Sequence, residues 1–381
     1  MGSRQALRAA AEPHVADDRI PGLVALAARG GEVHAVALGT LTAGADRPVQ
    51  RDSLFRIASV TKPITGAATL ALAAEGLLSL DEPVGRLLPE LASRRVLRRM
   101  DGPLDDTVPA RREITVRDLL TFTFGFGFAQ EMFTAAQPWP VMAAESDLRL
   151  ATLGWPDLAR QPGPDEWIAG LGSLPLLAQP GEQWMYNTGA SVLGVLLARA
   201  AGLPYGEVLR TRLFEPLGMR DTGFRVTEPG RLATAYRPGD GGVLEIWDEP
   251  GGIWASPLPF EDGAAGLVST ADDLLAFGRM LLNGGKPVLP GDSAAAMLTS
   301  QLTADQRRVL GPPLAQGDTW SFCQAVHADG TAGWDGGFGT SFVVDPARNL
   351  VVIVTTQRTF DGPFLPAVHR DVRAAAFAEL G

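Results

Sequence analysis

Two side chains that can cooperate in nucleophilic catalysis, Ser59 and Lys62, lie three residues apart. A strand-like run at residues 54–58 precedes a helix-like run at residues 61–78, so Ser59 is expected to be the helix N-cap. Residues three apart share one helix face, which brings the Lys62 ammonium within reach of the Ser59 hydroxyl. Burial and the positive end of the helix lower a lysine pKa. A serine becomes a good nucleophile when such a neighbouring base takes its proton.

Lysine is nearly absent from the chain, which uses it only at Lys62 and Lys286. The other basic residues are arginines, and a guanidinium cannot be deprotonated in a protein. A lysine kept one helical turn from a serine therefore favours a chemical role for its amine. The alternative is an N-capping serine beside an ordinary surface lysine.

The second proton-handling candidate is Tyr186, one of three tyrosines in the chain. It lies in a turn-like loop, residues 180–189, just before a helix, where side chains can project into a cleft. A positive charge nearby favours the tyrosinate, so Lys62 is expected to lower the pKa of Tyr186. The alternative is a tyrosine packed at an interface with its hydroxyl hydrogen-bonded.

A glycine-rich segment, residues 333–340, is the third candidate for the site. Its glycines allow the backbone of an edge strand to approach a ligand closely. Backbone N–H groups there, together with that of Ser59, are suited to stabilise a tetrahedral oxyanion. The alternative is a glycine-rich hairpin turn.

Composition and motifs exclude several other function classes. The chain has 381 residues with 46% apolar and 20% charged residues, and its net charge of −10 disfavours nucleic acid and anionic membranes. The single cysteine allows no internal disulfide. The start lacks a signal-peptide core and no apolar run reaches membrane-span length, so a soluble, cytoplasmic protein is expected. The histidines have no metal spacing, and the P-loop, dinucleotide and G-x-S-x-G motifs are absent, so no metal or cofactor is expected. His327 lies near the glycine-rich segment and is interpreted as a solvated loop histidine, with a place in the lining of the cleft as the alternative.

Strand-like segments at both ends of the chain enclose a helical and loop-rich middle. Helices are expected at residues 3–17, 61–78, 114–120, 190–201, from 205, 270–282 and 365–380. Strands are expected at residues 22–28, 32–38, 54–58, 319–326, 340–344 and 350–356. The prediction is an α/β (α+β) protein. Residues 1–80 and 245–381 form an antiparallel sheet flanked by helices, and residues 81–244 form a mainly α-helical domain over the site.

Taken in order, Ser59-Val60-Thr61-Lys62, Tyr186 and Trp334-Asp335-Gly336 resemble the motifs of the serine β-lactamase and penicillin-binding-protein superfamily, in particular its class C β-lactamase-like esterases. The resemblance covers about residues 5–378. It implies Ser59 as the acylated nucleophile, with Lys62 and Tyr186 as the proton-transfer pair. It also implies an oxyanion hole made by the N–H groups of Ser59 and Gly337.

Two motifs depart from the pattern of β-lactamases and peptidases. Asn187 directly follows Tyr186, where the family usually has Tyr-x-Asn, and the third motif begins with Trp334 rather than Lys or His. The second change removes a cation that would hold a substrate carboxylate. Both changes resemble the esterase branch. Residues predicted to contact the substrate are Trp334, Asp335, Gly336, Asn187, Phe124 and Trp254.

The sequence therefore predicts a cofactor-free serine hydrolase that cleaves small-molecule esters of small apolar acids, or amides, through acyl-Ser59. The alternatives are an acyltransferase using the same acyl-enzyme, a β-lactamase or D-peptidase, and a non-catalytic binding or sensor module. The sequence carries no signal for an oligomeric state or a particular natural substrate.

Overall fold

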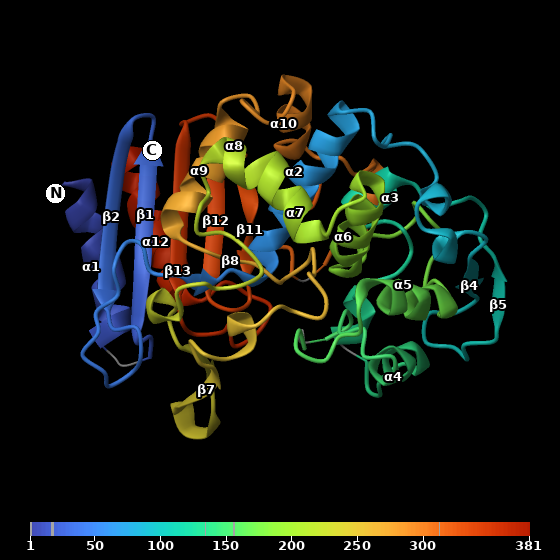
Figure 1. Cartoon of the computed structure of the whole chain (residues 1–381), viewed down its shortest axis with the longest axis horizontal. Coiled ribbons are helices and arrows are strands. Elements are labelled where there is room, and N and C mark those ends of the chain that lie inside the picture. The colour runs from blue at the N-terminus through green and yellow to red at the C-terminus, as the bar shows by residue number, and fades with distance from the viewer. Residues whose placement is uncertain (1, 17–18, 134, 155–156, 312) are drawn as a thin grey trace.

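A seven-stranded antiparallel sheet is the centre of the fold. The computed structural model describes residues 2–16, 19–133, 135–154, 157–311 and 313–381. Its strand order is β2-β1-β13-β12-β11-β10-β9 (Figure 1). The strands are β1 (Gly22–Arg29), β2 (Glu32–Gly39), β9 (Thr319–Trp320), β10 (Ala325–Val326), β11 (Ala332–Gly336), β12 (Thr340–Asp345) and β13 (Leu350–Thr356). The two ends of the chain meet in this sheet, since β1 pairs with β13 from Leu23 opposite Thr356 to Arg29 opposite Leu350. The predicted sheet built from both termini is confirmed.

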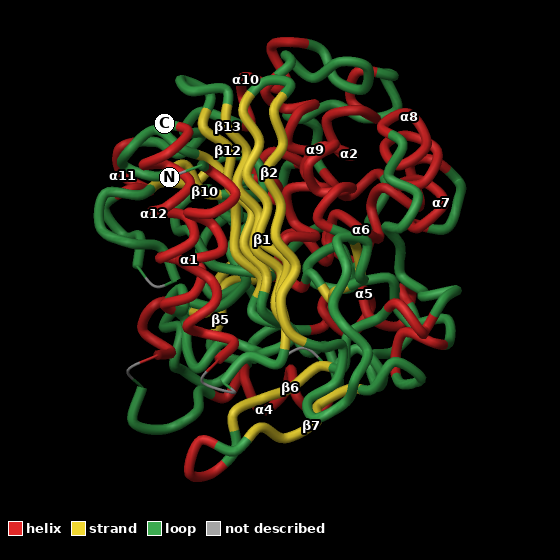
Figure 2. Tube along the Cα trace, turned by 90° about the vertical axis from the view of Figure 1, so that its left-hand side faces the viewer, coloured by secondary structure: helices red, strands yellow, loops and turns green. Residues whose placement is uncertain are grey.

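Helices cover both faces of the sheet, which explains why every residue of β12 and β13 is buried. Helices α1 (Ser3–Ala16) and α12 (Ala367–Leu380) pack on one face, and α2 (Thr61–Ala74) and α9 (Ala271–Leu282) lie on the other (Figure 2). The side chains of β1 alternate accordingly. Leu23 and Ala25 join the cluster under α1 and α12, whereas Val24 and Leu26 join the larger core.

The regular structure in the middle of the chain is mostly helical, and long loops join the helices. Its helices are α3 (Val116–Leu120), α4 (Pro140–Asp147), α5 (Pro164–Ser173), α6 (Thr188–Ala201), α7 (Tyr205–Leu209) and α8 (Glu215–Leu217). Helix α6 packs against α2 and α3, and ends at Gly202 in the left-handed conformation. Among the described helices, none alone is long and apolar enough to cross a bilayer. A pair bent by 77°, Thr188–Ala201 with Tyr205–Leu217, meets that test only when its two parts are taken together.

Two short strand pairs and two short helices complete the fold, mostly where the hydrophobic periodicity of the sequence is weak. The strand pairs are β4 (Arg95–Leu97) with β5 (Thr107–Pro109), and β6 (Ala235–Pro238) with β7 (Leu244–Asp248). Two further helices are α10 (Gly291–Met297) and α11 (Ala304–Arg307). The division of the chain at residues 80/81 and 244/245 stays a prediction.

Three predicted segments differ from the structure. The run at residues 54–58 contains only a two-residue strand, β3 (Phe55–Arg56), paired with β8 (Val268–Ser269), because the chain turns into a 3₁₀ helix, η1 (Ala58–Val60). The helix predicted to reach residue 78 ends at Ala74, where Gly76 takes a positive φ. The run at residues 319–326 is two short strands, β9 and β10, joined by a turn in which Cys323 has φ +62°.

Candidate active site

Ser59 lies at the middle of the η1 turn, immediately before α2, and its side chain is half-buried. The expectation that Ser59 caps α2 is wrong, because Val60 occupies the N-cap and no side chain caps that end. The preceding residue, Ala58, has φ +43°, a conformation that costs a non-glycine residue roughly 1–3 kcal/mol. The surrounding packing therefore holds the serine in a strained turn with its hydroxyl free of a capping role.

Lys62 projects from the first turn of α2 and is fully buried. Its Nζ lies 2.8 Å from Ser59 Oγ and donates to the Ala264 carbonyl, also at 2.8 Å. Burial penalises the ammonium and lowers the pKa of Lys62 to about 7, although the nearby Asp262 carboxylate acts in the opposite direction. A large fraction of the side chain is therefore a neutral amine at neutral pH, as a general base requires.

Tyr186 reaches the same serine from the other side of the cleft. Its hydroxyl donates to Ser59 Oγ at 3.0 Å and accepts a hydrogen bond from Trp334 Nε1 at 2.7 Å. Burial raises the pKa of Tyr186 to about 12 and outweighs the hydrogen bonds that lower it. The expected lowering by Lys62 is therefore wrong. Lys62 Nζ lies over the ring, 4.8 Å from its centroid, so it faces the π system rather than the phenol oxygen.

Trp334 does more than make the site apolar. It is 6% exposed on β11, and its indole N–H provides the hydrogen bond that fixes the phenol of Tyr186. The two rings are 5.4 Å apart. A lysine or histidine at this place in the family pattern would present a cation, whereas the indole presents a neutral donor to the tyrosine.

The loop that carries Tyr186 pairs with residues 122–128, here called the aromatic loop, in which Phe122 has φ +59°. Backbone hydrogen bonds join Tyr186 to Phe128 in both directions, at 2.8 and 3.0 Å, and Met185 N–H donates to the Phe122 carbonyl at 2.8 Å. Gly127 allows this approach, since a Cβ on it would lie 2.7 Å from the Tyr186 carbonyl oxygen. The tyrosine backbone is therefore fixed by a neighbour 58 residues earlier in the sequence.

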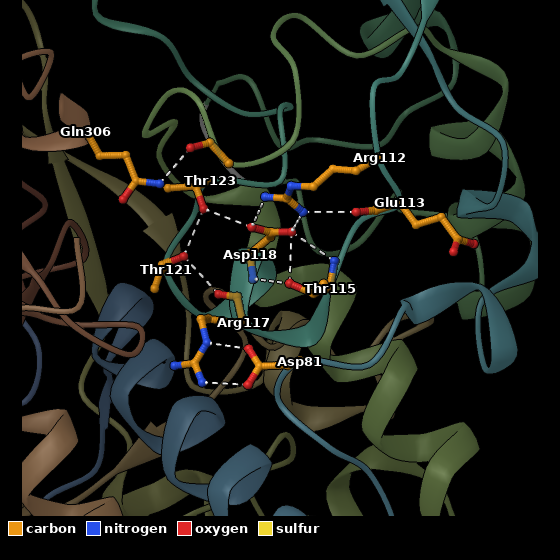
Figure 3. Close-up of polar contacts among 10 residues, drawn as sticks. Asp81, Arg112, Glu113, Thr115, Arg117, Asp118, Thr121, Thr123 and Gln306 are labelled. Carbon is orange, nitrogen blue, oxygen red and sulfur yellow. Dashed lines mark hydrogen bonds and ion pairs between the residues drawn. The ribbon is translucent and has the colours of Figure 1, made fainter. Parts of the chain in front are cut away.

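A buried carboxylate anchors the aromatic loop from behind (Figure 3). Asp118, 5% exposed on α3, pairs with Arg112 and accepts from the Thr115 N–H and hydroxyl in a capping box. It also accepts from the Thr123 hydroxyl at 3.4 Å. Thr123 lies in the segment that pairs with the loop of Tyr186. The Asp118 network therefore fixes the position of that loop.

The glycine segment approaches the nucleophile at close range. A Cβ on Gly336 would overlap the Ile57 carbonyl oxygen, so only glycine lets β11 lie this close to the turn that carries Ser59. Gly337 follows it, lines the same cleft as Ser59, and uses its carbonyl to accept from Phe360 N–H at 2.8 Å. An oxyanion hole made by the N–H groups of Ser59 and Gly337 stays a prediction that this arrangement accommodates.

The cleft in front of Ser59 has a volume of about 720 Å³. Three of the predicted substrate contacts, Trp334, Asp335 and Asn187, line it, and Asn187 also ties its amide to the Thr152 carbonyl at 3.1 Å. Gly336 does not line the cleft, because it packs against the backbone of Ile57. The expectations for Phe124 and Trp254 are wrong.

Both aromatic side chains belong to the core, where each is fully buried. Trp254 lies over the Arg56 guanidinium and donates to the Gly266 carbonyl at 2.8 Å, which explains why it points away from the cleft. Phe124 belongs to the aromatic loop that the Asp118 network anchors, on the side that faces the core.

Sequence reasoning missed three groups of the site. The Ala264 carbonyl that holds Lys62 comes from a turn fixed by Asp262, whose carboxylate accepts from the Ala264 N–H at 2.8 Å. Arg373 enters the cleft from α12, and His327, interpreted as a solvated loop residue, lines it with its Nδ1 2.8 Å from Asp318 Oδ2. The only signal was for His327, which lies near the glycine segment.

Comparison with known proteins gives consistent matches along the chain. The family model described as Beta-lactamase matches residues 7–377. Esterase EstB of Burkholderia gladioli is 34% identical over 374 residues, covering 90% of this chain and 88% of that protein. Protein Rv1367c of Mycobacterium tuberculosis is 37% identical over 335 residues, covering 82% of this chain and 80% of that protein.

Solved structures agree with the predicted fold class. EstCE1, described as a hydrolase with promiscuous acyltransferase activity, superposes with a TM-score of 0.80 at 26% identity and 98% coverage of both chains. Simvastatin synthase (LovD) of Aspergillus terreus superposes with a TM-score of 0.79 at 22% identity, covering 99% of this chain and 97% of that one. The second likeness concerns the fold alone.

Proposed function

The chain belongs to the β-lactamase family and is a serine hydrolase, and from this premise we propose that it cleaves carboxylic esters of small apolar acids through an acyl-Ser59 intermediate. The observation that carries the proposal is the position of Ser59 Oγ, which lies 2.8 Å from Lys62 Nζ and 3.0 Å from the Tyr186 hydroxyl. The name of the 34% identical relative, Esterase EstB, supports the ester as substrate class.

Lys62 is the base in the first step. Its neutral amine takes the Ser59 hydroxyl proton while Oγ forms a bond to the carbonyl carbon of the ester. The electron pair displaced from the C=O bond goes to the oxygen, where the N–H groups of Ser59 and Gly337 stabilise the charge. The low pKa of Lys62, about 7, makes the free amine available at neutral pH.

Tyr186 is the proton donor in the second step. A phenol whose pKa is raised to about 12 stays protonated at neutral pH, and its hydroxyl is already within reach of Oγ. When the bond between the carbonyl carbon and the alcohol oxygen breaks, the phenol protonates the leaving oxygen, and the proton of the Lys62 ammonium returns to the phenol through water in the cleft. Water then attacks the acyl-enzyme by the reverse sequence and releases the acid.

The apolar character of the site supports an ester of an apolar acid. Trp334 stands where a cation would hold a carboxylate, and Phe128, Phe338 and Phe360 line the same cleft. Apolar walls with a few convergent polar groups are typical of sites for small, largely uncharged ligands.

Acylation of the serine by p-nitrophenyl butyrate tests the proposal. Release of p-nitrophenol with a butyryl group located on Ser59 by peptide mass spectrometry is the expected result. Ser59→Ala should abolish both, whereas Ser53→Ala, which replaces a buried serine of the same segment, should keep the adduct. An adduct on any residue other than Ser59, or hydrolysis by Ser59→Ala at the native rate, would refute the assignment.

Acyl transfer is the second candidate function. A cleft of about 720 Å³ leaves space for an acceptor alcohol beside a small acyl group, and the similar structure of EstCE1 is described as having promiscuous acyltransferase activity. The partition of butyryl groups between water and an added alcohol, measured by chromatography of the two products, separates the functions. Production of acid alone at high alcohol concentration would exclude transfer.

A further inference from the structure

Arg373 brings a guanidinium into a cleft that the sequence predicts to lack a cation for carboxylates. It projects from α12, and its side chain, 14% exposed, forms an ion pair with Asp335 of β11, whose side chain is 23% exposed. The two residues are 38 positions apart, and both line the cleft that contains Ser59. The guanidinium therefore lies in the substrate cleft together with a counter-ion that the chain itself supplies.

The basic side chains that line the cleft contact carboxylates of the protein itself. Among the described lining residues, Arg373 is the only arginine or lysine, and His327 holds Asp318 at 2.8 Å. Asp361 is bound by Arg358 through two hydrogen bonds, at 3.0 and 2.7 Å. An incoming anion thus meets no lining guanidinium or ammonium that lacks a carboxylate partner.

We propose that Asp335 is a specificity-determining residue, which occupies the Arg373 guanidinium and so makes the cleft reject substrates that carry a carboxylate. A guanidinium binds a carboxylate through its planar set of donors, and Asp335 already neutralises that of Arg373 through one of its terminal nitrogens. A second anion would lie beside Asp335 and be repelled by its charge. The inference rests on the proposed ester hydrolysis and adds to it that the part of the substrate that faces Arg373 carries no carboxylate.

The ion pair also joins α12 to β11, and a purely structural role for it makes a different prediction. If Asp335 only connects the helix to the sheet, its loss lowers the melting temperature without changing the preference between anionic and neutral ligands. If Asp335 sets specificity, its loss exposes an anion site. Arg373 keeps an Nε–H without a partner among the described residues, so the pair with Asp335 does not exhaust its donors.

Binding of benzoate and benzamide to Asp335→Asn, measured by calorimetry, tests the inference without any turnover. The two probes have nearly the same shape and differ in charge. We expect benzoate to gain roughly tenfold or more in affinity relative to benzamide, as a charge-assisted contact to a freed guanidinium implies. The matched control is Asp361→Asn, which removes a carboxylate of the same cleft whose partner, Arg358, is not among its lining residues. It should leave the ratio unchanged.

Catalysis provides a second measurement of the same preference. Two substrate pairs measure the preference through kcat/KM. On the alcohol side, 4-carboxyphenyl butyrate is compared with its methyl ester, and on the acyl side, mono-p-nitrophenyl succinate is compared with p-nitrophenyl butyrate. In Asp335→Asn the ratio of charged to neutral substrate should rise for the pair whose carboxylate faces Arg373. The gain should disappear in the double variant Asp335→Asn/Arg373→Gln. Asp335→Ser removes the same charge and replaces Asp335→Asn if that variant does not fold.

The outcomes separate this inference from the proposed function. Unchanged benzoate-to-benzamide ratios in folded Asp335→Asn or Asp335→Ser overturn the specificity role, even if the protein hydrolyses butyrate esters normally. A gain in benzoate affinity that persists after Arg373→Gln also overturns it. Absence of ester hydrolysis by the unmodified protein refutes the proposed function instead, while the binding experiment remains interpretable.

Discussion

Replacing Lys62 by arginine keeps a positive charge beside Ser59 and removes the amine that we propose as the base. The size of the effect follows from the buried position of the side chain. With a pKa of about 7, Lys62 is about 90% neutral at pH 8, whereas a lysine at its ordinary value would be about 0.3% neutral. A guanidinium is never neutral at this pH.

We expect Lys62→Arg to lower kcat/KM for p-nitrophenyl butyrate by roughly 10²- to 10⁴-fold, the usual contribution of a general base. This corresponds to a rise of about 3–5 kcal/mol in the activation free energy. The assay is the initial rate of p-nitrophenol release at pH 8, with the yield of acyl-Ser59 measured by mass spectrometry. Lys286→Arg changes the only other lysine, which is exposed, and should leave the rate unchanged.

The pH dependence of the unmodified protein checks the same reasoning. Activity should rise as the pH increases through about 7, because the active form is the deprotonated amine, and the rising limb should be absent from Lys62→Arg. Lys62→Met, which removes the charge and fits a buried position, guards against misfolding of the arginine variant. Activity of Lys62→Arg within tenfold of the unmodified protein, or a rising limb near pH 10, would refute a neutral Lys62 as the base.

Three further predictions follow from the structure. Tyr186→Phe removes the proton donor and should lower kcat by roughly 10²-fold or more, whereas Tyr236→Phe, whose hydroxyl accepts from a distant backbone N–H, should leave kcat unchanged; equal rates for the two variants would contradict the role. Gly336→Ala should abolish acylation and lower the melting temperature because its Cβ would overlap the turn that carries the nucleophile, and Gly251→Ala, which has open space outside the cleft, is the control. Burial lowers the pKa of His369 to about 3, so the folded state disfavours its protonation. The contribution of His369 to the free energy of unfolding is present above pH 6.5 and is lost as the pH falls toward 3, by about 2 kcal/mol between pH 7 and pH 5. Measured by urea unfolding, the decrease in stability between these pH values should be smaller by that amount in His369→Leu. An equal decrease in the two proteins would contradict the lowered pKa of His369.

The sequence by itself determined the parts of this protein that depend on local spacing. Ser59 and Lys62 are three positions apart, so their spacing predicts the contact that the turn before α2 makes, although packing elsewhere sets the conformation of that turn. The apolar and β-branched runs of β1, β12 and β13 likewise predicted strands, and the structure adds that both faces of these strands are buried. Tyr186 and the segment that begins at Trp334 were candidates from their residue types, but only the family resemblance joined them to one site, since nothing local connects residues 148 positions apart.

Only the tertiary structure decided the electrostatics and the lining of the cleft. The pKa of Tyr186 is raised although a lysine lies beside it, because desolvation of the phenol depends on how completely the aromatic loop, Trp320 and Trp334 enclose it. Tertiary packing also makes Phe124 and Trp254 face the core and Arg373 face the cleft. Which face of an element meets the site is fixed by packing between segments that are far apart in the chain, and no periodicity within one segment encodes it.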